Sequence, residues 1–218
     1  MTRLRRSSWI AIPLIALVAT ALAQSSRTTT VPDQCRQFQS VPRDSRSITL
    51  PWEQRLSLAA CRQSVTITPT ANPVEFPQVI TRINQAMEPS LAIYRDAAAR
   101  GPTPQIRMLA EYGLGMAYVD SMIHARNAVL VRAEMYGGAT YGATVDPYVQ
   151  QHRQMEALLP PYRDGAVTAF NEVGRIAAQN PAAARANPVI VFVVADARTT
   201  ANLIMSTTET ATPSVSRR

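Results

Sequence analysis

Three side chains in the sequence have the types and the spacing of a metal site or an acid–base site. Asp120 and His124 lie four residues apart, so both would sit on one face of a helix. This spacing suits two metal ligands, or a histidine that a carboxylate orients. The only other histidine of the chain, His152, follows a predicted helix start and is the candidate for a third ligand.

The same spacing also fits an ion pair on the surface of a helix, and we favour this interpretation of Asp120 and His124. A metal site needs a third and usually a fourth ligand, and the sequence has no H-E-x-x-H, E-x-x-H or C-x-x-C motif. We therefore predict no metal and no cofactor. A metal-binding or hydrolytic helical bundle that uses Asp120, His124 and His152 stays open as the alternative.

Other signatures of catalysis are missing from the sequence. It contains no G-x-S-x-G motif, no Walker loop and no G-x-G-x-x-G motif. Glu111 and Asp120 are nine residues apart and do not share a helix face, so they form no evident carboxylate pair. The sequence therefore favours a protein that is not an enzyme.

Tyrosine and glycine gather in the segment "EMYGGATYGATVDPY", residues 134–148. One interpretation is a loop between helices whose tyrosines pack on the core. The other is an aromatic loop at the mouth of a binding groove, because tyrosine offers a large area and a polar tip. We take Tyr136, Tyr141 and Tyr148, together with Glu111, as the candidate binding residues.

The N-terminus has the three parts of a secretory signal peptide: arginines within residues 3–6, an apolar run at Trp9–Leu22, and small residues before a cleavage point after Ala23. The run contains Pro13 and is shorter than the roughly 20 residues of a membrane-spanning helix. We predict that residues 1–23 are removed, with an uncleaved anchor as the alternative. We also expect no membrane span in the mature protein, which would be periplasmic or secreted.

The charge pattern argues against nucleic-acid binding. All 22 basic residues are arginine, and removal of the signal peptide lowers the net charge from +7 to +4. The arginines are scattered, with no block of five or more and no interleaved aromatic residues of the kind that grips phosphates and bases. We therefore expect a protein or a peptide as the partner.

The two cysteines, Cys35 and Cys61, predict a disulfide, because an even number of cysteines in an exported protein is typical of a bonded pair. Closing a loop of this length would constrain the unfolded chain by about 3.5 kcal/mol in the chain-entropy model. A redox-active pair is usually closer in sequence.

The elements that position these residues are predicted to be helices. A good N-cap residue stands directly before a proline at residues 103–104, 146–147 and 187–188, which marks three helix starts. Apolar residues recur at helical spacing in five segments: 51–61, 78–100, 104–136, 147–159 and 161–179.

Individual residues refine this pattern. We expect Pro89 to kink or divide its helix, and we expect Gly113 and Gly115 to mark a tight crossing with another helix. The run "VIVFVV" at residues 189–194 suits a buried strand or a C-terminal helix, and the spacing of its apolar residues favours the helix. Residues 47–50 and 64–68 would pair as short strands beside the disulfide.

The predicted fold is therefore all-α. It consists of antiparallel helical hairpins, as a repeat array or an irregular bundle, with a disulfide-linked N-terminal segment. We expect one helical domain at residues 35–205, a flexible linker at residues 24–34 and a disordered tail at residues 206–218.

Parts of the chain resemble tetratricopeptide repeats. Residues 114–118, "LGMAY", match the L-G-x-x-Y pattern of the first helix of a repeat, and Tyr94, Ala97 and Pro102 match positions of the second helix. Glu111 stands where the family usually has tryptophan. The resemblance implies a scaffold that binds a peptide or a partner protein in a groove. The predicted function is thus an exported, non-enzymatic scaffold or adaptor for another envelope protein or peptide.

Overall fold

The structure is a computed structural model that describes residues 33–41, 49–63, 65, 67–129 and 147–209. All regular elements of these residues are helices, which confirms the all-α prediction. In chain order they are η1 (Asp33–Phe38), α2 (Trp52–Cys61), η2 (Pro73–Glu75), α3 (Phe76–Arg100), α4 (Pro104–Asn127), α5 (Pro147–Glu156), α6 (Pro160–Gln179), α7 (Pro181–Ala184) and α8 (Pro188–Glu209).

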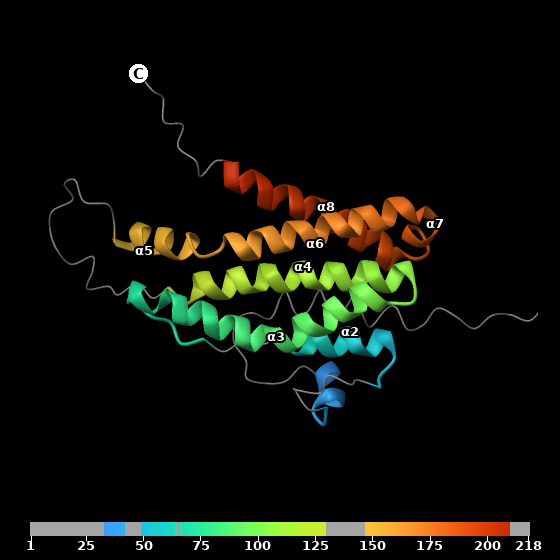
Figure 1. Cartoon of the computed structure of the whole chain (residues 1–218), viewed down its shortest axis with the longest axis horizontal. Coiled ribbons are helices and arrows are strands. Elements are labelled where there is room, and N and C mark those ends of the chain that lie inside the picture. The colour runs from blue at the N-terminus through green and yellow to red at the C-terminus, as the bar shows by residue number, and fades with distance from the viewer. Residues whose placement is uncertain (1–32, 42–48, 64, 66, 130–146, 210–218) are drawn as a thin grey trace, which may run out of the picture.

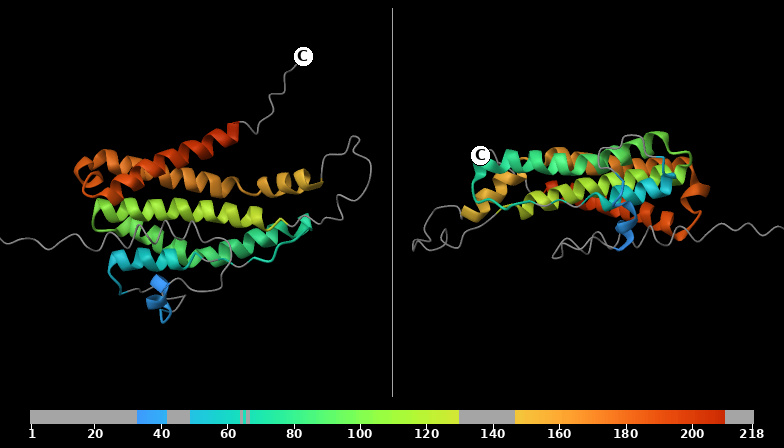
Figure 2. Two further views of the ribbon diagram at one scale, coloured as in Figure 1. Left: turned by 180° about the vertical axis from the view of Figure 1, so that it is seen from behind. Right: turned by 90° about the horizontal axis from the view of Figure 1, so that it is seen from below.

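Helix α4 is the central element of the fold. It packs on α3 and α2 at one side and on α6 and α8 at the other. Successive long helices run in opposite directions, and the order across the molecule is α3, α4, α6, α8 in Figure 1 and in the left view of Figure 2. The described residues thus form antiparallel helical hairpins. The finer prediction of a tetratricopeptide-like array stays a prediction.

All three predicted helix starts are confirmed, because α4, α5 and α8 begin at Pro104, Pro147 and Pro188, and the N-cap side chain is described for two of them. The Thr103 hydroxyl oxygen accepts a hydrogen bond from the Ile106 backbone N–H at 3.2 Å, at the start of α4. The Asn187 side-chain oxygen accepts one from the Ile190 backbone N–H at 3.0 Å, at the start of α8. Each satisfies a backbone donor that the first turn of a helix leaves without a partner. The third predicted N-cap, Asp146, lies outside the described residues.

Pro89 lies inside α3 without dividing it. The helix changes direction part-way along its length (Figure 1). A proline removes one backbone hydrogen bond and displaces the carbonyl one turn earlier, which bends a helix. The next residue, Ser90, is fully buried and donates a hydrogen bond to the carbonyl oxygen of Ala59 in α2 at 2.9 Å. This part of α3 is therefore held against α2.

The tight crossing predicted at Gly113 and Gly115 is confirmed on two sides of α4. A Cβ atom at Gly113 would lie 2.3 Å from Cε1 of Tyr94 in α3, and one at Gly115 would lie 2.6 Å from Cε1 of Phe170 in α6. Both distances are far below van der Waals contact. The absence of a side chain at these positions lets a buried aromatic ring approach the α4 backbone on each side.

The predicted disulfide between Cys35 and Cys61 is confirmed, with Cα atoms 5.5 Å apart, and it ties η1 to the end of α2. The predicted strand pair beside it is wrong for the described parts of residues 47–50 and 64–68, which form no strand. Instead, the N–H of Thr70 donates to the carbonyl of Ala128 at 2.8 Å, in an isolated bridge just after α4 ends. Helix α4 therefore ends at Asn127, short of the predicted residue 136.

The C-terminal segment is helical, as predicted, but α8 continues to Glu209 and so includes four residues that we assigned to a disordered tail. The hydroxyls of Ser206 and Thr207 donate to the carbonyls of Leu203 and Ile204, each at 2.9 Å. These local hydrogen bonds satisfy side chains whose polarity had suggested a tail. The buried stripe of α8 packs into a core cluster with α4 and α6; it contains Val189, Ile190, Val193, Ala197 and Ala201.

Candidate functional site

Asp120 and His124 lie on α4 and are both half-buried. Burial raises the pKa of Asp120 to about 6 and lowers the pKa of His124 below its usual value. The Asp120 carboxylate lies near enough to Tyr94 of α3 to help raise the pKa of that tyrosine, after the larger effect of burial. Asp120 thus faces the α3 side, in surroundings that disfavour charge on both residues.

The predicted surface ion pair is wrong. Of the ion pairs among the described residues, none joins Asp120 to His124. A surface pair would be in water, where both charged forms are stable, whereas partial burial here favours the neutral carboxyl and the neutral imidazole. The sequence spacing placed the two residues on one helix face but did not indicate that this face is turned inward.

His152 lies on α5, close enough to Glu156 for its charge to help lower the pKa of that carboxyl. Within the described residues, no three His, Cys, Asp or Glu side chains come together as a group able to hold a metal ion. Asp120, His124 and His152 all belong to the described residues, so the structure does not assemble them as the ligand set of the alternative prediction.

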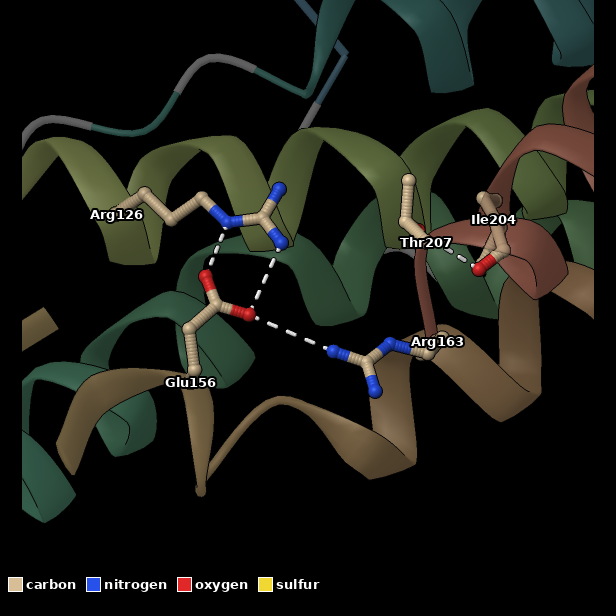
Figure 3. A network of polar contacts seen from close by, with 5 residues as sticks. All are labelled: Arg126, Glu156, Arg163, Ile204 and Thr207. Carbon is tan, nitrogen blue, oxygen red and sulfur yellow. Dashed lines mark hydrogen bonds and ion pairs between the residues drawn. The ribbon is translucent and has the colours of Figure 1, made fainter. Parts of the chain in front are cut away.

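Glu156 is at the centre of a polar network that connects three helical segments (Figure 3). The Arg126 guanidinium of α4 donates to it at 2.5 and 3.1 Å, and Arg163 of α6 donates at 3.4 Å. The hydrogen bond from Arg126 is the main reason why the pKa of Glu156 is lowered. Because the Glu156 carboxylate is bound by an arginine of α4 and an arginine of α6, this network joins α4, α5 and α6.

Glu111, one of the predicted binding residues, lies half-buried on the side of α4 that faces α6. Burial first, and then repulsion from Glu172 of α6, raise the pKa of Glu111 to about 7, while Arg175 opposes them. Glu172 itself accepts a hydrogen bond from Arg175 Nε at 2.6 Å, which lowers its pKa. The two carboxyls thus differ in protonation near neutral pH, although this cluster is part of the contact between two packed helices.

The other predicted binding residues are not placed by the structure. Tyr136 and Tyr141 lie outside the described residues, and Tyr148 is the second residue of α5 with a side chain that is also outside them. The predicted aromatic loop stays a prediction.

Tyr112 was not singled out from the sequence, and it fixes the orientation of α8. Its hydroxyl donates to a carboxylate oxygen of Asp196 at 2.7 Å, and its ring lies 6.0 Å from that of Phe170, between centroids. Burial and the neighbouring Asp196 both raise the pKa of Tyr112. The bond holds Asp196 at α4, and the side of α8 that points away from its buried stripe faces outward.

That outward side is the candidate binding surface of the protein. We call it the outer face of α8, and its exposed residues are Val191, Phe192, Ala195, Arg198, Thr199, Asn202, Leu203 and Met205. Four of them are large and apolar, and their exposed fractions are 49% for Val191, 51% for Phe192, 62% for Leu203 and 43% for Met205. A helix at the edge of a core normally carries charged and polar residues on this side. The outer face of α8 therefore exposes more apolar surface than its packing requires.

The sequence contained a signal for this surface that we did not use. The predicted core stripe of α8 already accounted for residues 189, 193, 197, 200 and 204, and most of them are buried as predicted. Val191 and Met205 fall on the far side of the same helical wheel, and Phe192 and Leu203 lie at its flank. A helix at the edge of a core needs apolar residues only on the side that it buries, so further apolar residues on its surface are not explained by that core.

One further expectation needs correction. Among the described residues, α8 is long and apolar enough to cross a membrane by length and composition, with 28% of the relevant segment buried inside the protein. We expected no such stretch after the signal peptide. The reason for the difference is that the segment Pro188–Thr207 carries only two charged residues, Asp196 and Arg198.

Comparison of the chain with protein-family models, with curated proteins and with solved structures finds no match. The residues of the chain are therefore the basis for a proposed function.

Proposed function

We propose that the protein is an exported helical scaffold or adaptor, without enzymatic activity, that binds another envelope protein or a peptide through the outer face of α8. The observation that supports this proposal most directly is the exposure of Val191, Phe192, Leu203 and Met205 along one helix. Exposed apolar side chains gathered on one surface are typical of interaction sites. Covering them would remove apolar area from water, which favours association.

Export is supported by two independent features. Residues 1–23 have the pattern of a secretory signal peptide, and Cys35 and Cys61 form a disulfide. Disulfides persist in oxidising compartments such as the periplasm and the extracellular space. N-terminal sequencing of the protein from the envelope fraction tests this part: the proposal requires a chain that begins at Gln24, and a chain that retains residues 1–23 contradicts cleavage.

The scaffold role also agrees with the resemblance to tetratricopeptide repeats, in which antiparallel helical pairs present a binding surface. The metal-binding alternative lacks its ligand set in the described residues, since Asp120, His124 and His152 do not come together. The binding role is therefore the better supported of the two.

Site-specific photocrosslinking in living cells tests the binding role. A benzophenone amino acid replaces Phe192 or Leu203 on the outer face of α8, and in a matched control it replaces Gln85, which is exposed on α3. We expect both α8 positions to crosslink to the same protein, and the Gln85 position not to do so. Identical products at all three positions, or none at the α8 positions, would contradict the proposal.

A further inference from the structure

Building on the proposed function, we infer that the segment captured by α8 is an amphipathic helix of another protein, with a carboxylate that faces Arg198. The inference depends on where the charges of α8 lie relative to its exposed apolar side chains.

Val191, Arg198 and Met205 recur at seven-residue spacing along the outer face of α8. Residues seven positions apart lie two turns apart on almost the same line of a helix, a separation of about 10.5 Å. Arg198 thus stands midway between two exposed apolar residues. Phe192 and Leu203 extend the apolar surface to one side of this line. A second helix laid along the line would contact apolar residues at both ends and an arginine at the centre.

Arg198 is available for a partner. No hydrogen bond or ion pair joins it to another of the described residues, and the only other charge of the segment, Asp196, accepts the hydrogen bond of Tyr112. An apolar partner would leave the guanidinium of Arg198 desolvated and unpaired, which is unfavourable. A carboxylate would bind it in the paired geometry that arginine favours.

A second copy of the chain is a poor occupant because the line is symmetric about Arg198. Two copies of α8 that match apolar with apolar residues, whether parallel or antiparallel, place Arg198 against Arg198 of the other copy. A shift by seven residues avoids that contact but sets Arg198 against Val191 or Met205. Self-pairing therefore opposes like charges or buries an arginine against apolar side chains, and both are unfavourable.

A lipid bilayer is a poor occupant for a related reason. A membrane-spanning α8 would carry Asp196 and Arg198 near the centre of the bilayer, where ionised side chains are costly. It would also have to break the bond between Tyr112 and Asp196 and withdraw the buried stripe from α4 and α6. A partner helix with one acidic residue at its centre would cover the same apolar side chains and pair with Arg198, while α8 keeps its bond to Tyr112 and its packing on α4 and α6.

A displayed library of helical peptides tests the inference with a defined probe. The disulfide-bonded protein selects from random amphipathic peptides of about 20 residues, a helix long enough to lie along the whole outer face. We expect the selected sequences to share one acidic position between apolar residues seven positions before and after it. Selected sequences without such an acid, or a library from which nothing is selected, would overturn the inference.

A charge exchange then identifies the contact. We expect Arg198→Glu to weaken the selected peptide by about tenfold or more, because the change puts two carboxylates face to face. A peptide with lysine in place of its acid should recover the lost affinity for this variant. Arg95→Glu, at an arginine of α3 that pairs with Glu88, is the control for the added negative charge, and it should leave binding unchanged. Equal affinity of wild type and Arg198→Glu would overturn the inference.

Further readouts separate this inference from the proposed function. If Phe192→Asp abolishes peptide binding while Arg198→Glu does not, the outer face of α8 binds partners but the acidic contact is wrong. If sizing shows a dimer that Phe192→Asp dissociates, or if the protein floats with vesicles of phosphatidylcholine and phosphatidylglycerol, the occupant is a second copy or a bilayer and the inference is overturned. Loss of both peptide binding and crosslinking at position 192 would contradict the proposed function itself.

Discussion

Helices α3 and α8 flank the pair α4 and α6 on opposite sides, yet their outward faces differ (Figure 1). The exposed side of α3 carries charges that pair with each other: Arg95 with Glu88 at 3.1 Å, and Arg100 with Asp96. The exposed side of α8 carries four large apolar residues and Arg198, which pairs with no other side chain among the described residues. The outward side of a surface helix is usually polar, and α3 follows this rule whereas α8 does not. The amino-acid composition of the chain alone does not explain this difference.

The largest effect that we predict lies on the α3 side, which we define as η1, α2 and α3. Replacing Cys35 and Cys61 together by serine should lower the free energy of unfolding by about 3.5 kcal/mol, because the disulfide limits the unfolded chain. Denaturation with urea measures this loss. A reducing agent should destabilise the wild type by a similar amount and leave the double variant unchanged; a loss below about 1 kcal/mol would show that the disulfide contributes little.

The two glycine contacts compare the α3 side with the α8 side, which we define as α6, α7 and α8. Gly113→Ala and Gly115→Ala should each lower the free energy of unfolding by about 1–3 kcal/mol, because the new methyl group would overlap the ring of Tyr94 or Phe170. The loss of stability should be at least as large for Gly113→Ala as for Gly115→Ala, because the Cβ atom at position 113 would lie closer to the neighbouring ring. Thermal and urea denaturation measure both losses.

Gly174 of α6 is the matched control for these variants, because a Cβ atom there would meet nothing within 4 Å. Gly174→Ala should raise the free energy of unfolding by about 0.5–1 kcal/mol through helix propensity alone. If all three alanine variants gain stability, the close approach of the rings to α4 is wrong.

On the side of α4 that faces α6, Glu111→Gln should stabilise the protein at neutral pH. The pKa of Glu111 is raised from its usual 4.5 to about 7, so the wild type is most stable below pH 4.5 and loses stability as the pH rises through 7. Discounted for partial solvent screening, the variant should be more stable by about 1 kcal/mol above pH 7 and equal to the wild type below pH 4.5. Urea denaturation at several pH values measures the difference; a constant difference across this range would contradict the raised pKa.

On the side of α4 that faces α3, Asp120→Asn should also stabilise the protein, in a lower pH window. Burial alone raises the pKa of Asp120 from 3.8 to about 6, so the wild type loses stability between these values and the variant gains about 1 kcal/mol or less above pH 6. Glu172 repels Glu111 but not Asp120. In the Glu172→Gln variant, the stability gained by Glu111→Gln should therefore be smaller, and the stability gained by Asp120→Asn should be unchanged. Equal effects at both positions would contradict this distinction.

Much of the fold could be predicted because it depends on local rules. The caps at Thr103 and Asn187, the stripes of apolar residues and the pairing of Cys35 with Cys61 each follow from residue type and spacing. The close approaches at Gly113 and Gly115 were also predictable, because glycine inside a helix is unfavourable unless another element needs the space.

The candidate site could not be predicted in the same way, because it depends on how whole helices are turned. Spacing put Asp120 and His124 on one face, but whether that face meets water or α3 is set by packing with residues distant in the sequence. On α8, spacing predicted the buried stripe, but it did not indicate that the other apolar side chains of the helix stay exposed. The Tyr112–Asp196 bond that joins α8 to α4, across a separation of 84 residues, was not predictable from spacing either.

The smallest effect on stability that we predict is the one that tests the comparison most directly. Phe192 and Val193 are neighbours in sequence, but Phe192 is 51% exposed on the outer face of α8 and Val193 is 4% exposed in the core. Phe192→Ala should change the free energy of unfolding by less than about 0.5 kcal/mol, as expected for a surface residue. Val193→Ala should lower it by about 1–2 kcal/mol, through lost burial and the cavity that remains.

Binding should reverse that order. Phe192→Ala should weaken crosslinking from position 203 and peptide capture, whereas Val193→Ala should retain both under conditions in which it is folded. Glu88→Ala, on the charged face of α3, should be near neutral in stability and in binding. If Phe192→Ala instead destabilises the protein as much as Val193→Ala, the outer face of α8 is already covered by the protein's own chain. The contrast between α3 and α8 would then mean that the apolar residues of α8 are part of the protein's own core and do not form a binding surface.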